Sequence, residues 1–183
     1  MTWIPPVIAV WEKISSSSRI LTKLYSRPYL QVIQNEIHLA KITQQDVILN
    51  IGCGAIPFTA LYLAALTGAR VYALDNDARA VCRASHCVNK AGLSQYIKVI
   101  EGDGAVPVDM QFTSALVALQ AAPKKSILES IRRSAPPGAR FIFRLPSSKY
   151  RQQYDNLLTS QQAEGLVIQP MRTFDRSVLY VNQ

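Results

Sequence analysis

The stretch DVILNIGCGAIPFTALYLAALTGARVYALDND, residues 46–77, has the pattern of a strand, a glycine-rich turn, a helix, a second strand and an acidic residue. The apolar run at 47–51 is typical of a strand buried in a parallel sheet. Pro57 suits the first turn of the helix, where its missing N–H costs nothing, and Gly68 is expected to end that helix. Asp75 follows the glycines by about twenty residues, a spacing that places an acid to accept hydrogen bonds from ribose hydroxyls.

The turn differs from the dinucleotide fingerprint G-x-G-x-x-G/A, because its pattern is Gly52-x-Gly54-x-x-Pro57. Glycines still let the backbone approach a ligand closely. Any α/β protein can carry glycines after a strand, but the full order of strand, G-x-G, helix, strand and acid is far more specific. The turn is similar to that of class I S-adenosylmethionine (SAM)-dependent transferases, whose ligand has ribose and adenine but no pyrophosphate. The resemblance implies SAM as cosubstrate.

Strands and helices continue to alternate downstream, which indicates a parallel sheet. Further strands are expected at 97–100, 114–119 and 139–143, and helices at 78–91, 124–134 and 152–162. The last two strands, 166–171 and 177–181, are joined by a short turn at 174–176, which permits only an antiparallel hairpin. Upstream, an amphipathic helix at 29–41 follows shorter helical pieces at 7–14 and 19–25.

The predicted fold is therefore a doubly wound, Rossmann-like α/β sheet, mostly parallel with a C-terminal antiparallel hairpin. A helical cap at 1–45 precedes a SAM-binding domain at 46–183. Ligands of such sheets bind beyond the carboxyl ends of the strands. The residues expected around SAM are Gly52, Cys53, Gly54, Pro57, Asp75, Asn76, Asp103, Gly104 and Gln120. In the SAM-transferase pattern, an acid placed like Asp103 meets the adenine amino group, although Asp-Gly is also a favoured turn pair.

A closer resemblance covers roughly Tyr29 to Arg144. The segment SALVALQ…KKSILESIRRSAPPGARFIFR is similar to the second half of the catalytic domain of nicotianamine synthases. The turn GCGAIPFT resembles that family's G-x-G-x-x-P-x-T/S turn. Tyr29 and Glu36, seven residues apart, resemble its N-Y-x-x-L-x-x-L-E segment, whose tyrosine lies at the substrate cavity.

The resemblance implies transfer of the 3-amino-3-carboxypropyl group of SAM to an amine, with release of methylthioadenosine. Tyr29, Glu36 and Arg144 are then the candidate catalytic residues. Arg144 is placed to pair with a carboxylate of a substrate, and Glu36 to hold or deprotonate an amine. For the same three residues, the alternatives are a helix-face aromatic, a solvated acid and a surface cation.

Two other functions stay open. Only about 45 residues precede the first strand, fewer than the helical domain of nicotianamine synthases, so a small-molecule methyltransferase on the same scaffold is a serious alternative. A non-catalytic module that binds SAM or nucleic acid is the second, because the net charge is +8 and the pI about 9.6. The cations at 124–151 are scattered, however, which favours a solvated basic face over a nucleic-acid site.

The composition excludes several classes. Hydrophobic residues make up 49% and charged residues 17%, as in a globular chain and not a disordered one. No apolar run reaches the roughly 18 residues that a membrane span needs, and the start lacks a secretory signal. Cys53, Cys82 and Cys87 form no C-x-x-C pair, so we expect no metal site and a reducing cytoplasm. Cys82 and Cys87 are expected to pack as small apolar residues, and His38 and His86 to be structural or exposed.

Overall fold

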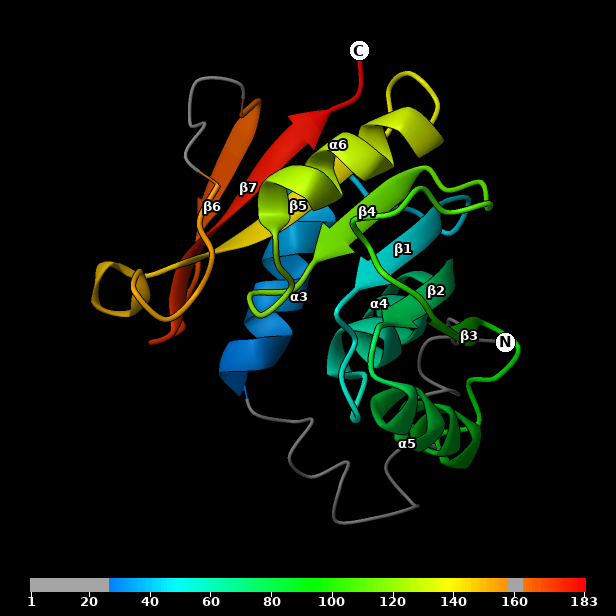
Figure 1. Cartoon of the computed structure of the whole chain (residues 1–183). Coiled ribbons are helices and arrows are strands. Elements are labelled where there is room, and N and C mark those ends of the chain that lie inside the picture. The colour runs from blue at the N-terminus through cyan, green and yellow to red at the C-terminus, as the bar shows by residue number, and fades with distance from the viewer. Residues whose placement is uncertain (1–26, 158–162) are drawn as a thin grey trace, which may run out of the picture.

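The computed structural model describes residues 27–157 and 163–183, which contain one seven-stranded sheet in the order β3-β2-β1-β4-β5-β7-β6 (Figure 1). The strands are β1 (Val47–Ile51), β2 (Arg70–Asp75), β3 (Ile97–Glu101), β4 (Ser114–Val117), β5 (Arg140–Pro146), β6 (Gly165–Ile168) and β7 (Phe174–Val181). The helices are α3 (Arg27–Leu39), α4 (Phe58–Thr67), α5 (Ala78–Lys90), α6 (Lys124–Ser134) and the 3-10 turn η1 (Ser148–Tyr150). Strands β1 to β5 pair in parallel, and β7 runs antiparallel to both β5 and β6. The predicted fold is confirmed.

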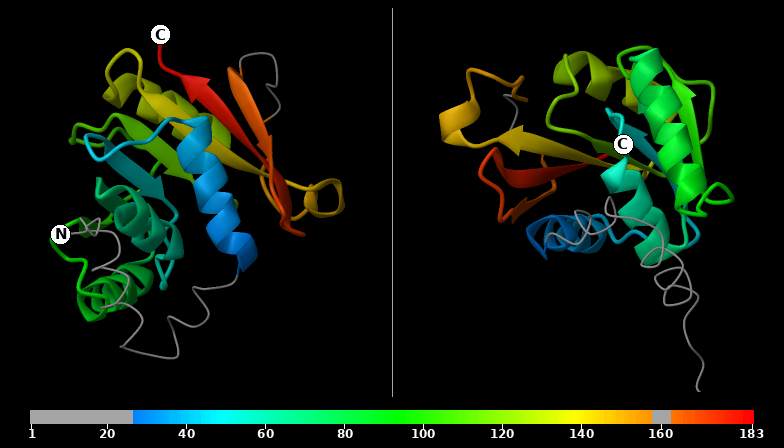
Figure 2. Two further views of the ribbon diagram at one scale, coloured as in Figure 1. Left: turned by 180° about the vertical axis from the view of Figure 1, so that it is seen from behind. Right: turned by 90° about the horizontal axis from the view of Figure 1, so that it is seen from below.

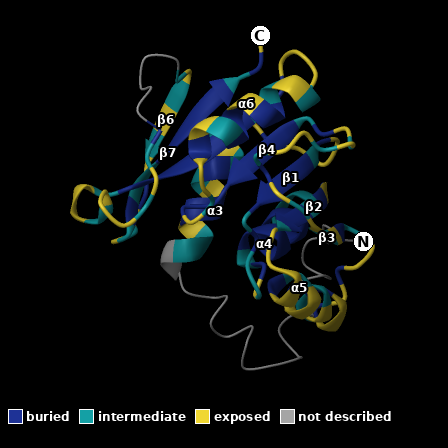
Figure 3. Cartoon of the chain, viewed as in Figure 1, coloured by how far each residue is buried: buried dark blue, intermediate teal, exposed yellow. Residues whose placement is uncertain are grey.

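Helices cover both faces of the sheet, because successive residues of each strand point to opposite sides. Ile48 packs with side chains of α3, α4 and α5 on one face, whereas its neighbour Leu49 packs with α6 and Phe112 on the other. Figure 2 shows α3 and α6 on opposite sides of the sheet. The central strands β1, β4 and β5 are buried except for the first residue of β1 and of β5, and the exposed residues lie in loops and on the outer faces of the helices (Figure 3).

The helix boundaries around the turn follow the sequence signals. Helix α4 begins directly after Pro57 and ends at Gly68, which has the left-handed φ of 70° that favours glycine at this position. Helix α5 begins after Asp77, whose carboxylate accepts the backbone N–H of Arg79 at 2.8 Å. Both predicted helices of this half of the sheet are therefore confirmed.

The segment after β5 differs from the prediction. A helix was expected at 152–162, but the described part, 152–157, is not helical. Hydrogen bonds between residues three apart form η1 and the turns after it, and the carboxylate of Asp155 accepts the backbone N–H of Lys124 at the start of α6. The remainder of that helix, and the helical pieces expected at 7–14 and 19–25, lie outside the described residues.

The final hairpin also has different boundaries. The turn was expected at 174–176, but β7 already begins at Phe174, which is buried and pairs with Pro146 of β5. The connection between β6 and β7 is therefore the segment 169–173. Strand β5 likewise extends past its predicted end, so that Arg144 lies within the strand and not after it. Cross-strand pairing with β7 accounts for both extensions.

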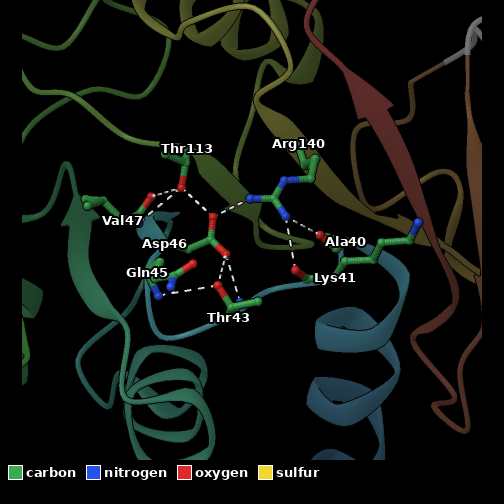
Figure 4. A network of polar contacts seen from close by, with 8 residues as sticks. All are labelled: Ala40, Lys41, Thr43, Gln45, Asp46, Val47, Thr113 and Arg140. Atoms are coloured by element: carbon green, nitrogen blue, oxygen red, sulfur yellow. Dashed lines mark hydrogen bonds and ion pairs between the residues drawn. The ribbon is translucent and has the colours of Figure 1, made fainter.

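At the amino ends of the strands, a polar network fastens α3 to the sheet (Figure 4). Arg140 on β5 donates to the backbone carbonyls of Ala40 and Lys41 and forms an ion pair with Asp46. Asp46 also accepts hydrogen bonds from Thr43 and Thr113. Burial alone would raise the pKa of Asp46, but these hydrogen bonds and Arg140 lower it overall. The network fixes the carboxyl end of α3 against the sheet.

Some side chains do not lie where the sequence suggested. Cys82 is exposed and Cys87 half-buried, so the expectation that both pack as small apolar residues is wrong for Cys82, because its position on α5 faces outward. Two cations counted in the basic stretch, Lys124 and Arg144, are buried and add nothing to a basic surface. His38 and His86 are exposed, as expected. No helix in the described ranges is long and apolar enough to cross a membrane.

Candidate active site

A cavity of about 500 Å³ opens at the carboxyl ends of β1, β2, β3 and β4. Eight of the nine residues predicted around SAM line it: Gly52, Cys53, Gly54, Asp75, Asn76, Asp103, Gly104 and Gln120. The ninth, Pro57, is buried at the start of α4 and is not part of the lining. The sequence therefore located this end of the cavity correctly, because each of these eight residues lies at the carboxyl end of a strand or shortly after it.

The glycine turn is held against β2 by backbone hydrogen bonds. The N–H groups of Gly52 and Cys53 both donate to the carbonyl of Leu74, at 2.9 and 3.1 Å. Gly52 and Gly54 have backbone φ angles of 76° and 68°, which residues with a Cβ atom rarely adopt. A Cβ added to Gly54 would meet no atom within 4 Å, so the open space beside this residue is the cavity itself.

Asp75 connects the turn with the second strand. Its Oδ2 accepts the N–H of Gly54 at 2.7 Å and its Oδ1 that of Asp77 at 3.1 Å. Each carboxylate oxygen has two lone pairs, so both can accept a further hydrogen bond from a ligand hydroxyl. Burial, together with the charge of Asp75, raises the pKa of the Cys53 thiol to about 12. Cys53 is thus a neutral, inert part of the wall at physiological pH.

The third strand ends in a turn that belongs to the same cavity. Asp103 is exposed, and its Oδ1 accepts the N–H of Ala105 at 2.9 Å. Asp103 is therefore a turn aspartate and a cavity residue at once. A Cβ on the adjacent Gly104 would lie 2.5 Å from Cγ2 of Ile51, so only glycine fits at this position.

At the other end of the cavity, α3 and β5 bring the three predicted catalytic residues together. Nε and Nη2 of Arg144 each donate to one oxygen of Glu36 at 2.8 Å, and Nη1 donates to the Tyr29 hydroxyl at 2.9 Å. The spacing of seven residues places Tyr29 and Glu36 on the same side of α3, two turns apart. Tyr29 and Arg144 line the cavity, whereas Glu36 is not among the described lining residues and is fully buried.

The pair is neither a solvated acid nor a surface cation. Glu36 is 0% exposed and Arg144 only 3%. Burial alone would lower the pKa of Arg144, but the charges of Glu36 and Tyr29 and their hydrogen bonds outweigh it, and the pKa is raised. The guanidinium also lies between the rings of Tyr29 and Phe174, 5.3 and 5.4 Å from their centroids. Arg144 is thus permanently charged.

Several site residues were not predicted. The Thr59 hydroxyl lies 2.6 Å from that of Tyr29 and accepts from Nη1 of Arg144 at 3.2 Å. The ring of Phe58 packs edge-on against Tyr29 at 6.1 Å. Thr59 and Phe58 both line the cavity and belong to the turn motif quoted above, so the motif contained a signal for them. Ser177, which donates to Glu36 at 2.7 Å, had none, because it lies 141 residues away.

Among residues 27–157 and 163–183, no three His, Cys, Asp or Glu side chains gather as they would around a metal ion. The sheet order, the antiparallel β7, the glycine turn and the acids after β2 and β3 together define the fold of class I SAM-dependent transferases. Residues 14–173 match the family model described as "Nicotianamine synthase protein". The chain belongs to the nicotianamine synthase family.

One relative by sequence is the L-histidine 2-aminobutanoyltransferase of Yersinia pestis, which is 32% identical over 114 residues. That alignment covers 61% of this chain and 43% of the relative, so the chain matches less than half of that protein's length. The sterol 24-C-methyltransferase of Eremothecium gossypii is 35% identical over 66 residues, or 36% of this chain and 17% of that protein.

Two solved structures show the shared fold. MtNAS in complex with MTA and tNA has a TM-score of 0.79 and 22% identity over 97% of this chain and 69% of its own. An RNA methyltransferase from Salinibacter ruber in complex with S-adenosyl-L-homocysteine has a TM-score of 0.62 and 16% identity over 83% of this chain and 90% of its own.

Proposed function

We propose that this protein is an enzyme that transfers the 3-amino-3-carboxypropyl group of SAM to an amine. The observation that carries the proposal is that Tyr29, whose hydroxyl is held by the buried Arg144–Glu36 pair, lines the same cavity as the glycine turn. Membership of the nicotianamine synthase family and similarity to an enzyme named as an L-histidine 2-aminobutanoyltransferase support the choice of transferred group.

The residues present fit SAM as cosubstrate. Asp75 has lone pairs for the ribose hydroxyls, Asp103 suits the adenine amino group, and the open space at Gly54 suits the methionine portion. The remaining wall, formed by Tyr29, Phe58 and Thr59, is then left for the acceptor. An aromatic wall with hydroxyl groups is compatible with an amine, which donates hydrogen bonds and, when charged, is attracted to ring faces.

The proposed reaction is a nucleophilic displacement. The amine nitrogen attacks the carbon of the aminocarboxypropyl group that is bonded to the sulfonium. The neutral amine forms the new C–N bond as the C–S bond breaks, the C–S electron pair stays on sulfur to give neutral methylthioadenosine, and the new ammonium releases one proton to water. The sulfonium carbon is already electrophilic, so the protein's main task is to orient and desolvate the two reactants.

We assign Tyr29 the role of contacting the acceptor, because Tyr29 lines the cavity. Arg144 holds that hydroxyl, and Glu36 holds Arg144. The expectation that Glu36 binds or deprotonates the amine directly then requires movement, since its carboxylate is engaged by the guanidinium. We therefore propose that Glu36 acts on the acceptor through Arg144 and Tyr29.

The proposed partner is a small amine or amino acid, and histidine is the first candidate, from the name of the Yersinia pestis relative. The free cysteines Cys53, Cys82 and Cys87 support a reducing, cytoplasmic setting. Methyl transfer is the second candidate function, which the alignment with a sterol methyltransferase favours.

The by-product distinguishes the two functions. The protein is incubated with SAM and either histidine or a mixture of amino acids and polyamines, and the nucleosides are analysed by mass spectrometry. We expect methylthioadenosine that depends on the protein and falls at least tenfold in Tyr29→Phe, as for loss of one catalytic hydrogen-bonding group. The matched control is Tyr72→Phe, on β2 outside the cavity. Formation of S-adenosylhomocysteine instead would establish methyl transfer.

A further inference from the structure

A chain of polar side chains that do not line the cavity connects Glu36 with the C-terminal hairpin. Ser177 on β7 is fully buried and donates its hydroxyl proton to Oε1 of Glu36 at 2.7 Å. Gln169, which follows β6 and is 4% exposed, donates its side-chain N–H to the Ser177 oxygen at 3.0 Å. Asn35 on α3 donates to the Gln169 carbonyl oxygen at 3.0 Å. Buried polar groups destabilise a fold unless they are paired, and here every member has a partner.

The hydrogen bonds of this chain have a single direction. Because Asn35 donates to the Gln169 oxygen, the Gln169 nitrogen is turned toward Ser177. The Ser177 oxygen accepts that bond, so its own proton is directed to Glu36. The chain thus supplies Glu36 with a donor that does not come from Arg144.

This additional donor fixes the orientation of the Glu36 carboxylate. Oε1 accepts from Ser177 and from Nε of Arg144, and Oε2 accepts from Nη2. A bidentate pair requires the carboxylate and guanidinium to lie near one plane. With that plane set, the third nitrogen, Nη1, points to the Tyr29 hydroxyl.

We propose that Ser177 and Gln169 are positioning residues that hold Glu36 and Arg144 in the orientation that presents the Tyr29 hydroxyl to the acceptor. The inference rests on the proposed function and adds the C-terminal hairpin to the catalytic machinery. Neither residue is part of the described cavity lining, so we expect neither to contact SAM. Their loss therefore changes turnover and leaves SAM binding in place.

Steady-state kinetics of methylthioadenosine release tests the proposal. In Ser177→Ala and Gln169→Leu we expect kcat to fall about tenfold, as for a misplaced catalytic group, with the Kd for SAM within about twofold. Ser177→Thr keeps the hydroxyl and restores kcat. The matched control is Ser114→Ala, which removes a buried strand serine whose hydroxyl has no hydrogen-bond partner among the described residues. An unchanged kcat in both test variants, or equal losses of kcat and SAM affinity, would overturn the proposal.

A second measurement does not depend on turnover. The ¹⁵N NMR signal of the Arg144 Nε–H, assigned from its absence in Arg144→Lys, reports the Glu36 hydrogen bond. We expect it to shift in Ser177→Ala and Gln169→Leu, and to stay in place in Ser177→Thr and Ser114→Ala. A signal that does not move in Ser177→Ala contradicts the positioning role. If the wild type released no methylthioadenosine, the proposed function would fail, while this signal would still decide whether the chain orients Arg144.

Discussion

At the residue scale, Arg144 is directed toward its own neighbours more than toward an incoming ligand. The sequence suggested that it pairs with a carboxylate of a substrate, but all three of its nitrogens already donate to Glu36, Tyr29 or Thr59. The positive charge is compensated inside the protein by Glu36. We therefore interpret Arg144, which lines the cavity together with Tyr29 and Thr59, chiefly as the residue that holds the Tyr29 hydroxyl in place.

Replacing Glu36 tests how strongly this cluster depends on charge pairing. Glu36→Gln leaves the buried Arg144 guanidinium without its counter-charge, and loss of one partner of a buried pair costs about 3–5 kcal/mol. We expect the free energy of unfolding in urea to fall by that amount. The control is Asp175→Asn, because the Asp175–Arg176 pair is partly exposed and such pairs contribute only about 0–1 kcal/mol. Equal, small losses in both variants would show that the buried pair is not structural.

Replacing Asp75 tests the nucleotide end of the cavity. Asp75→Ala removes acceptors for the ribose hydroxyls, which we expect to weaken SAM binding by about 1–3 kcal/mol in calorimetry. Asp77→Ala is the matched control, since Asp77 is an exposed acid two residues away that caps α5 and does not line the cavity. SAM affinity that is the same in both variants, or tight binding of NAD in place of SAM, would contradict this assignment.

The nucleotide end of the site was predictable because its signals are local. Gly52, Gly54 and Asp75 lie within 24 positions of one another in a single strand–turn–helix–strand unit. The hydrogen-bonding role of Ser177 was not predictable, since it depends on the register between β5 and β7, which pairs Ser177 with Arg144. Burial of Glu36 and Arg144 was missed for the same reason. In the sequence, Glu36 and Arg144 each resemble an ordinary surface charge. Charged side chains are rarely buried unless they are paired, so their burial depends on the contact between them.

At the element scale, the loop between β4 and α6 is fastened by a buried lysine. Lys124 donates its ammonium protons to the carbonyls of Leu119 and Ala121, at 2.7 and 2.8 Å. Gln120 and Ala121 line the cavity, so this lysine fixes one of its walls. Burial lowers the pKa of Lys124 to about 8, although the charge of Asp155 acts in the opposite direction.

The lowered pKa predicts a specific pH dependence of stability. The folded-state pKa of about 8 lies below the ordinary value of 10.5, so the folded state binds fewer protons than the unfolded chain between these values. The unfolding free energy of the wild type, relative to that of Lys124→Met, should therefore rise from pH 8 to pH 10.5, by an amount on the order of 3 kcal/mol. The exposed neighbour is the control, and Lys125→Met should show no such difference. A flat difference curve for Lys124→Met would contradict the assignment.

The elements themselves were predicted best where the periodicity was long. The helix expected at 124–134 matches α6, because its apolar residues recur at three- and four-residue steps. The helix expected at 152–162 failed in its described part. In this part, residues 152–157 are not helical, and the Asp155 carboxylate accepts the backbone N–H of Lys124 at the start of α6. No local sequence signal indicates that contact.

At the scale of the whole molecule, the two ends of the cavity come from different parts of the chain. Strands β1 to β3, in the first half of the sheet, lead to the glycine turn, Asp75 and Asp103, whereas α3 and β5 contribute Tyr29 and Arg144 (Figure 1). The strand order places β4 between β1 and β5, so that Arg144 and the glycine turn line one cavity although 90 positions separate Arg144 from Gly54. The sheet thereby brings the proposed cosubstrate and acceptor together.

The measurement that tests this account most directly uses SAM with a ¹³C-labelled methyl group. The protein is incubated with this SAM and an amine acceptor, and both products are analysed by mass spectrometry. The account predicts that the label stays entirely in methylthioadenosine, while the acceptor gains an unlabelled 3-amino-3-carboxypropyl group. Recovery of the label in the acceptor, with unlabelled S-adenosylhomocysteine as by-product, would contradict it.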